Sequence, residues 1–139
     1  MKNYKILAEF IKDISSETKD IQTYLFVKDH ISKYQLTIDI NSQPTKNKLI
    51  EISTFMKFED KENNEKKSFF ELVYVTIIKL DENVKEKKEI EKIILCDVQN
   101  KIYLDLEKSL LDLLHNSGFP GIKFEKKIDF ENLYNQRSN

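Results

Sequence analysis

Apolar and polar residues alternate along much of the first 80 residues, as they do in β-strands whose two faces differ. The alternation predicts strands at residues 4–14, 36–40 and 49–58. In the first, Tyr4, Ile6, Ala8 and Phe10 form the more apolar side. The segment 42–47 is rich in turn-forming residues, so we expect the second and third strands to form a hairpin. A polar turn at 60–67 then leads to a fourth strand.

This fourth strand, residues 68–80, is apolar on both faces. One face carries Phe69, Val73, Val75 and Ile77, and the other carries Phe70, Leu72, Tyr74 and Ile78. Antiparallel sheets that leave one face to water show a cleaner alternation, so both faces need cover. The helices of the chain supply one layer, and we expect a second subunit or a bound protein to cover the other face. The alternative is that the long connection 15–33 folds over it.

From Val84 the apolar period becomes helical. The stripe that it forms contains Ile90, Ile93, Ile94, Val98, Ile102, Leu106, Leu110, Leu113 and Leu114. Three of the four Gly and Pro residues of the chain lie within 118–121, which predicts a helix end, a turn and a short extended return over 121–124. Asp129 is placed to cap a last short helix with apolar positions Phe130, Leu133 and Tyr134.

Strands that precede helices predict the α+β class, here a four-stranded antiparallel sheet with the C-terminal helices packed on one face. The length of 139 residues suits a single domain, residues 1–139.

The 23 basic residues nearly balance the 24 acidic ones, which argues against nucleic acid or an anionic membrane as partner. Glu9 interrupts any signal peptide, and no run reaches the roughly 20 apolar residues of a membrane helix. With Cys96 as the only cysteine, we expect a cytoplasmic protein.

The search for catalytic or metal-binding motifs finds none. His30 and His115 are isolated in the sequence, and we expect the first in a surface loop and the second in the last turn of the long helix. Two glycines cannot make a phosphate-binding loop, and neither His-x-x-x-His nor Cys-x-x-Cys occurs. The sequence therefore predicts a protein that is not an enzyme and needs no metal or cofactor.

Three segments together resemble the SecB family of bacterial export chaperones, in the same order over nearly the whole chain. They are Phe-Ile-Lys-Asp-Ile-Ser-Ser-Glu at 10–17, Leu-Thr-Ile-Asp-Ile at 36–40, and the Gly-Phe-Pro-Gly turn at 118–121 with Asp-Phe-x-x-Leu-Tyr at 129–134. The resemblance implies an ATP-independent holdase, a homotetramer built as a dimer of dimers, that binds unfolded secretory precursors and passes them to the SecA ATPase. The chain departs from the family in lacking tryptophan and the prolines usual around 18–25 and 98–103.

The resemblance also suggests which carboxylates contact SecA. In the family a flat acidic sheet surface docks this motor, and the matching positions are Asp13, Glu17 and Glu71. Exposed carboxylates on a rigid sheet steer and orient a basic partner. Taken alone, Glu71 among apolar neighbours would instead be a solubility gatekeeper.

Binding of unfolded clients calls for apolar and aromatic surface, since contact with many sequences must be non-directional. The resemblance assigns this role to Leu36, Ile38 and Ile40 of the second strand. We add Tyr24, Phe26 and Tyr34 because aromatics in the polar connection have no obvious core role; the alternative is that they pin the connection to the core. The main alternative function is a SecB-like chaperone dedicated to one partner, such as a toxin–antitoxin system. A monomeric small-molecule-binding domain with a closed pocket is a third possibility.

Overall fold

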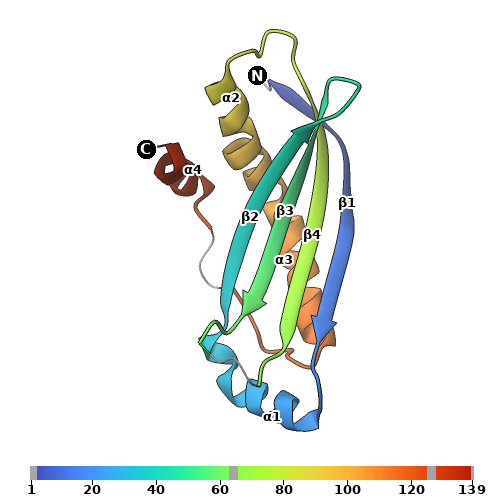
Figure 1. Cartoon of the computed structure of the whole chain (residues 1–139), viewed down its shortest axis with the longest axis vertical. Helices are drawn as coiled ribbons and strands as arrows, with labels where there is room; N and C mark the ends of the chain where they lie inside the picture. Colours follow the sequence, from blue (N-terminus) through green and yellow to red (C-terminus); the bar gives the residue numbers. More distant parts are fainter. Residues whose placement is uncertain (1–2, 63–65, 125–127, 139) are drawn as a thin grey trace.

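The computed structural model describes residues 3–62, 66–124 and 128–138 and confirms the α+β fold. Four strands, β1 (Tyr4–Glu17), β2 (Gln35–Pro44), β3 (Leu49–Glu59) and β4 (Phe69–Leu80), form one antiparallel sheet in the order β1-β4-β3-β2. The predicted hairpin is the β2–β3 pair, and β1 and β2 both run further than their alternation indicated. The edges of the sheet are therefore β1 and β2 (Figure 1).

One long helical rod covers a single face of the sheet, as the stripe predicted (Figure 1). It consists of α2 (Lys87–Lys92), a π-helical segment (Ile93–Asp97) and α3 (Val98–Asn116). The rod begins at Lys87 rather than near Val84, and the π-helical turn has no signature in the apolar pattern. The last helix, α4 (Phe130–Ser138), is capped as expected, because the Asn132 amide donates to Asp129 Oδ1 at 3.0 Å.

Two local predictions are wrong. The connection 15–33 is not a loop: it contains α1 (Ile21–His30) and a 3₁₀ turn (Ile31–Lys33), so His30 ends a helix. The Thr23 amide donates to Asp20 Oδ1 at 2.8 Å, and hydrogen bonds from the Thr23 side chain and amide lower the pKa of the Asp20 carboxyl. The extended return over 121–124 is also absent as a strand, since these residues pair with no neighbour in the sheet.

The register separates the two faces of the sheet. Residues directly opposite each other in antiparallel strands share a face, and Met56 opposite Leu72 marks the buried face under the helices. On β1 the register shifts between Ile6 and Ala8 and again between Ile11 and Asp13. The first of these bulges moves Ala8 and Phe10 to the outer face, so the predicted side containing Tyr4, Ile6, Ala8 and Phe10 is divided.

The outer face of the sheet stays open to solvent in the described chain. The α1 helix lies beyond one end of the sheet instead of across this face (Figure 1). Phe10 and Phe69 remain 46% and 39% exposed there. The idea that the connection 15–33 covers the second apolar face is therefore wrong.

A buried polar contact joins the sheet to the helical rod. The Thr54 hydroxyl donates to Gln99 Oε1 at 3.1 Å, and Gln99 Nε2 donates to the Ile94 carbonyl of the π-helical segment at 3.4 Å. Both side chains are fully buried. Gln99 therefore ties the π-helical turn to β3.

We expect Gln99→Leu to lower the free energy of unfolding by about 1–3 kcal/mol, because the buried Thr54 hydroxyl loses its acceptor. The double variant Thr54→Val/Gln99→Leu should lose less than the sum of the two single variants, since it removes both polar groups. Equilibrium urea unfolding measures all three. Strict additivity would contradict this account of the contact.

Candidate functional site

An open apolar groove of about 1160 Å³ lies at the α1 end of the sheet. Its walls come from the end of α1 and the 3₁₀ turn, from the neighbouring ends of β2 and β3, and from the segment that follows α3. The apolar side chains that line it are Ile31, Tyr34, Leu36, Phe58, Phe119, Ile122, Phe124 and Ile128. Such a surface offers non-directional apolar contact over several residues of a bound chain.

The turn after α3 shapes one wall of this groove. Gly118 has φ of 103°, a conformation that L side chains rarely adopt, and it turns the chain so that Phe119 points into the core. The Tyr24 hydroxyl donates to the Gly118 carbonyl at 2.7 Å, and the Tyr24 ring packs 5.3 Å from that of Phe119. His115 Nε2 lies 3.3 Å from the Ile122 carbonyl and holds the far side of the turn.

Tyr34 anchors the floor of the groove. Its hydroxyl donates to the Ser68 carbonyl at 3.1 Å and accepts from the Ser68 amide at 2.8 Å. Burial raises the pKa of this phenol, so it stays a neutral donor at physiological pH. Its ring packs against Phe58 and Phe70, with centroids 5.3 and 6.2 Å away. The floor is thus a fixed aromatic surface.

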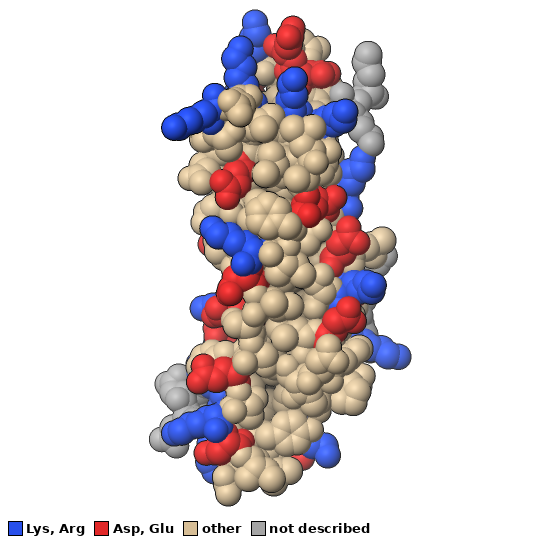
Figure 2. All heavy atoms as spheres, turned by 90° about the vertical axis from the view of Figure 1, so that its right-hand side faces the viewer, with Lys and Arg blue, Asp and Glu red and all other residues tan. Residues whose placement is uncertain are grey.

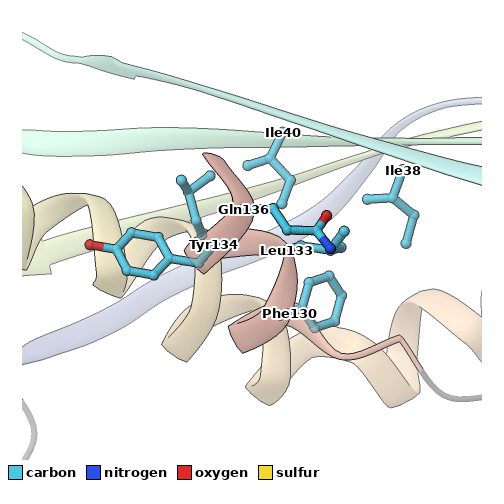
Figure 3. Close-up of a pocket in the computed structure, with 7 residues that line it drawn as sticks. Ile38, Ile40, Phe130, Leu133, Tyr134 and Gln136 are labelled. Atoms are coloured by element: carbon cyan, nitrogen blue, oxygen red, sulfur yellow. The ribbon is translucent and has the colours of Figure 1, made fainter. Parts of the chain in front are cut away.

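A second and smaller hollow, of about 200 Å³, lies between β2 and α4. Figure 3 shows Ile38 and Ile40 of β2 directed toward Phe130, Leu133 and Tyr134 of α4. Phe130 is buried against Tyr103 with ring centroids 5.7 Å apart, which seats the helix. The start of α4 therefore lies over this part of β2.

The predicted client-binding residues occupy different places. Leu36 and Tyr34 line the groove, whereas Ile38 and Ile40 line the hollow under α4. Tyr24 packs behind the wall of the groove, and Phe26 is stacked on His30 at 4.0 Å without lining either hollow. The contacts of Tyr24 and Tyr34 fit the alternative in which aromatics pin the connection to the core.

Several lining residues were not identified from the sequence. These are Ile31, Phe58, Phe119, Ile122, Phe124, Ile128 and the two lysines Lys28 and Lys123. The Gly-Phe-Pro-Gly turn was the available signal for the segment 118–124, because an apolar chain after a helix stop must pack on something. Nothing local in the sequence marks Phe58 as part of a groove.

The three carboxylates assigned to motor docking meet on the outer face. Asp13 is opposite Val73, Glu17 opposite Phe69, and Glu71 lies between those two on β4. The Lys57 ammonium lies 3.5 Å from Glu71 Oε1 and partly neutralises it. Seen from the β1 side, acidic side chains flank a band of uncharged surface (Figure 2). The structure therefore places Glu71 of β4 on the same face as Asp13 and Glu17 of β1, which forms an acidic patch beside exposed apolar side chains.

The described residues contain no group of three or more His, Cys, Asp and Glu side chains that could hold a metal ion. The Cys96 side chain is buried, and burial raises the pKa of its thiol. No helix in the described ranges is long and apolar enough to cross a membrane.

Comparisons with known proteins agree with this geometry. The family model described as preprotein translocase subunit SecB matches residues 1–139. A putative protein-export protein SecB of Pelagibacter ubique (strain HTCC1062) is 61% identical over 137 residues, which cover 99% of this chain and 98% of that protein. Among solved structures, the SecB-like chaperone Rv1957 of Mycobacterium tuberculosis, in complex with a ChAD peptide from the antitoxin HigA1, superposes with a TM-score of 0.61. That likeness covers 90% of this chain and 91% of the other at 9% identity, and it shows the shared fold.

Proposed function

Because this chain belongs to the SecB family, we propose that it is an ATP-independent holdase that binds unfolded secretory precursors in the cytoplasm and delivers them to SecA. The observation that carries the proposal is the open groove with an aromatic floor. A groove of this kind holds apolar segments of many sequences by non-directional contact. No covalent step is involved, and a client is retained by mass action on its unfolded state.

The β2 strand suits this role for a second reason. It is an edge strand, and Leu36 on its helix-facing side lines the groove. An extended client segment in the groove could therefore bury side chains against Leu36 while its backbone lies near the free edge of β2. It stays a prediction that clients contact Leu36, Ile38, Ile40, Tyr24, Phe26 and Tyr34. In this prediction Tyr24 and Tyr34 contribute by holding the shape of the groove.

The test is arrest of refolding without ATP. The purified protein, at subunit concentrations equal to the client, should halt the refolding of several unrelated, slow-folding secretory precursors. Arrest of one protein only, with the others unaffected, would favour the dedicated-partner alternative. No arrest by a well-folded sample would overturn the holdase proposal.

A chaperone dedicated to one partner is the second candidate. The neighbour that shares this fold was solved with a single antitoxin peptide bound. In addition, Lys57 partly neutralises Glu71, and the net charge of the chain is only −1, so the field that would attract a basic motor is weak. These observations argue against delivery to SecA, but they do not argue against client binding in the groove.

Delivery to SecA is proposed through Asp13, Glu17 and Glu71 on the outer face. We expect Glu71→Lys to lower SecA affinity several-fold, because it reverses one charge of the patch and places it beside Lys57. Client holding should stay within twofold. Glu82→Lys, an equal charge change at an exposed position in the turn after β4, is the matched control. Unchanged SecA affinity in Glu71→Lys would contradict the assignment of this face.

We also propose that the protein forms a homotetramer. The β1 strand presents a 14-residue edge with Phe10, Ile11 and Ile14 exposed, and such edges are normally paired or covered. Leu104 on the outside of α3 is 68% exposed, which leaves a second apolar contact available. Sedimentation velocity should give four times the chain mass, and a single monomeric species would contradict this assembly.

A further inference from the structure

Among the residues that the structure describes, the charged side chains that line the groove are two lysines. Lys28 of α1 and Lys123 of the segment after α3 line it from two separate walls, and both are exposed. Among the described residues that line the groove, none is acidic. Neither lysine has an ion-pair partner in the described chain. The groove is therefore an apolar trough with an unbalanced positive rim, although the whole chain is nearly neutral.

Asp29, Glu59 and Asp60 lie next to the groove in the sequence, but none of them is among the described residues that line it. Glu59 follows Phe58 on β3, and strand alternation directs it to the opposite face of the sheet. Asp60 is buried, and its Oδ1 accepts the Glu62 amide at 3.0 Å. The mouth of the groove faces Lys28 and Lys123.

An apolar wall of low dielectric strengthens the effect of charges at the rim. A client carboxylate beside either lysine gains an ion pair, whereas a client lysine or arginine there meets a like charge without a counterion. The volume of the groove exceeds the range of about 300–1,000 Å³ typical of small-molecule sites, so it suits several residues of an extended chain. Residues on both sides of a bound apolar segment would then lie near the rim.

We propose that this groove selects apolar client segments flanked by Asp or Glu and discriminates against segments flanked by Lys or Arg. The inference deepens the proposed holdase function and rests on it. Lys28 and Lys123 determine this specificity, and the aromatic floor supplies the part of the affinity that is independent of charge.

Three labelled peptides test the proposal. They share one apolar core rich in Leu and Phe and differ only in their flanks, which are Asp, Ser or Lys on both sides. In fluorescence anisotropy with the full chain at low ionic strength, the acidic peptide should bind about three- to tenfold more tightly than the neutral one, as expected for one or two exposed ion pairs. The basic peptide should bind more weakly than the neutral one by a similar factor. At about 0.5 M salt the three affinities should converge on the neutral value.

Charge reversal at the rim provides the matched variant. Lys28→Glu/Lys123→Glu should invert the order of the three affinities, so that the basic peptide binds most tightly and the acidic peptide most weakly. Lys46→Glu/Lys87→Glu makes the same change in net charge at exposed positions that do not line the groove, and it should keep the original order. Circular dichroism and the unfolding midpoint establish that both variants fold.

The outcomes separate the two ideas. If the neutral peptide binds but the three affinities are equal, the charge selectivity is overturned and the holdase function stands. If the Lys46→Glu/Lys87→Glu control also inverted the order of the three peptide affinities, the proposal would be overturned, because the preference would then follow the net charge of the protein and not the lysines of the groove. If no peptide binds, the proposed function fails as well. Peptide affinity that falls as protein concentration rises would assign the groove to a second copy of the chain and overturn the proposal.

Discussion

Replacing Gly118 by alanine should lower the free energy of unfolding by about 2–3 kcal/mol. The backbone φ of 103° is one that L side chains rarely adopt, which costs roughly 1–2 kcal/mol. A Cβ at this position would also lie 2.6 Å from Tyr24 Cε1, so the ring must move and its hydrogen bond to the Gly118 carbonyl, worth about 1 kcal/mol, weakens. Equilibrium urea unfolding measures the loss.

Gly121 provides the matched control, because it lies three residues away in the same turn. It has no positive φ, and an added Cβ would meet no atom within 4 Å. We expect Gly121→Ala to leave stability unchanged or to raise it by up to about 1 kcal/mol through the unfolded chain. Equal losses in both variants would show that the turn tolerates no side chain for some other reason. Because Tyr24 holds the wall of the groove, Gly118→Ala should also weaken client binding.

Leu36→Asp should reduce affinity for unfolded clients about tenfold or more. Leu36 lines the groove, and a carboxylate there would have to be desolvated against apolar client side chains, a cost well above the 1.4 kcal/mol that corresponds to a factor of ten. Arrest of client refolding and direct binding of the neutral apolar peptide both measure the change. Binding to SecA should be unaffected, since Leu36 and the acidic patch lie on opposite faces.

Thr37→Asp is the control for this variant. Thr37 is the next residue of the same edge strand, is exposed and lies on the other face of the sheet. It introduces the same charge into the same strand without entering the groove. An equal loss in both variants would place the client site elsewhere. Leu36→Asn serves as a milder change if Leu36→Asp proves unstable.

The sequence was sufficient to predict the elements in which buried residues recur at a regular spacing over a few positions. In β4, Leu72 and Val73 alternate between the two faces as predicted, and the stripe through Leu106 and Leu110 marks the helix that covers the sheet. The cap at Asp129 was also readable, because an N-cap involves residues only three positions apart. Alternation likewise placed Leu36, Ile38 and Ile40 on one side of β2.

Other features were not readable because distant contacts decide them. The α1 helix has an inconspicuous pattern, with Thr23 and Val27 inward and Ile21 and Leu25 exposed, so its packing appears only in the folded chain. The bulges of β1 are seen only in its pairing with β4, and the first of them reverses the face on which Ala8 and Phe10 lie. The π-helical turn is joined to β3 by the hydrogen bonds of Gln99 with Ile94 and Thr54, which only the folded chain brings together.

The sequence by itself therefore determined the class of the fold, the order of the four strands and the later helices, and the resemblance to SecB, since periodicity and short motifs are properties of neighbouring residues. Tertiary structure alone decided which residues form the groove. Tyr34, Phe58 and Phe119 come from separate parts of the chain and meet only when the sheet, α1 and the turn after α3 pack together. It also decided that Lys28 and Lys123 share one rim and that Asp13, Glu17 and Glu71 share one face, because the register of paired strands and the end of a helix bring distant charges together.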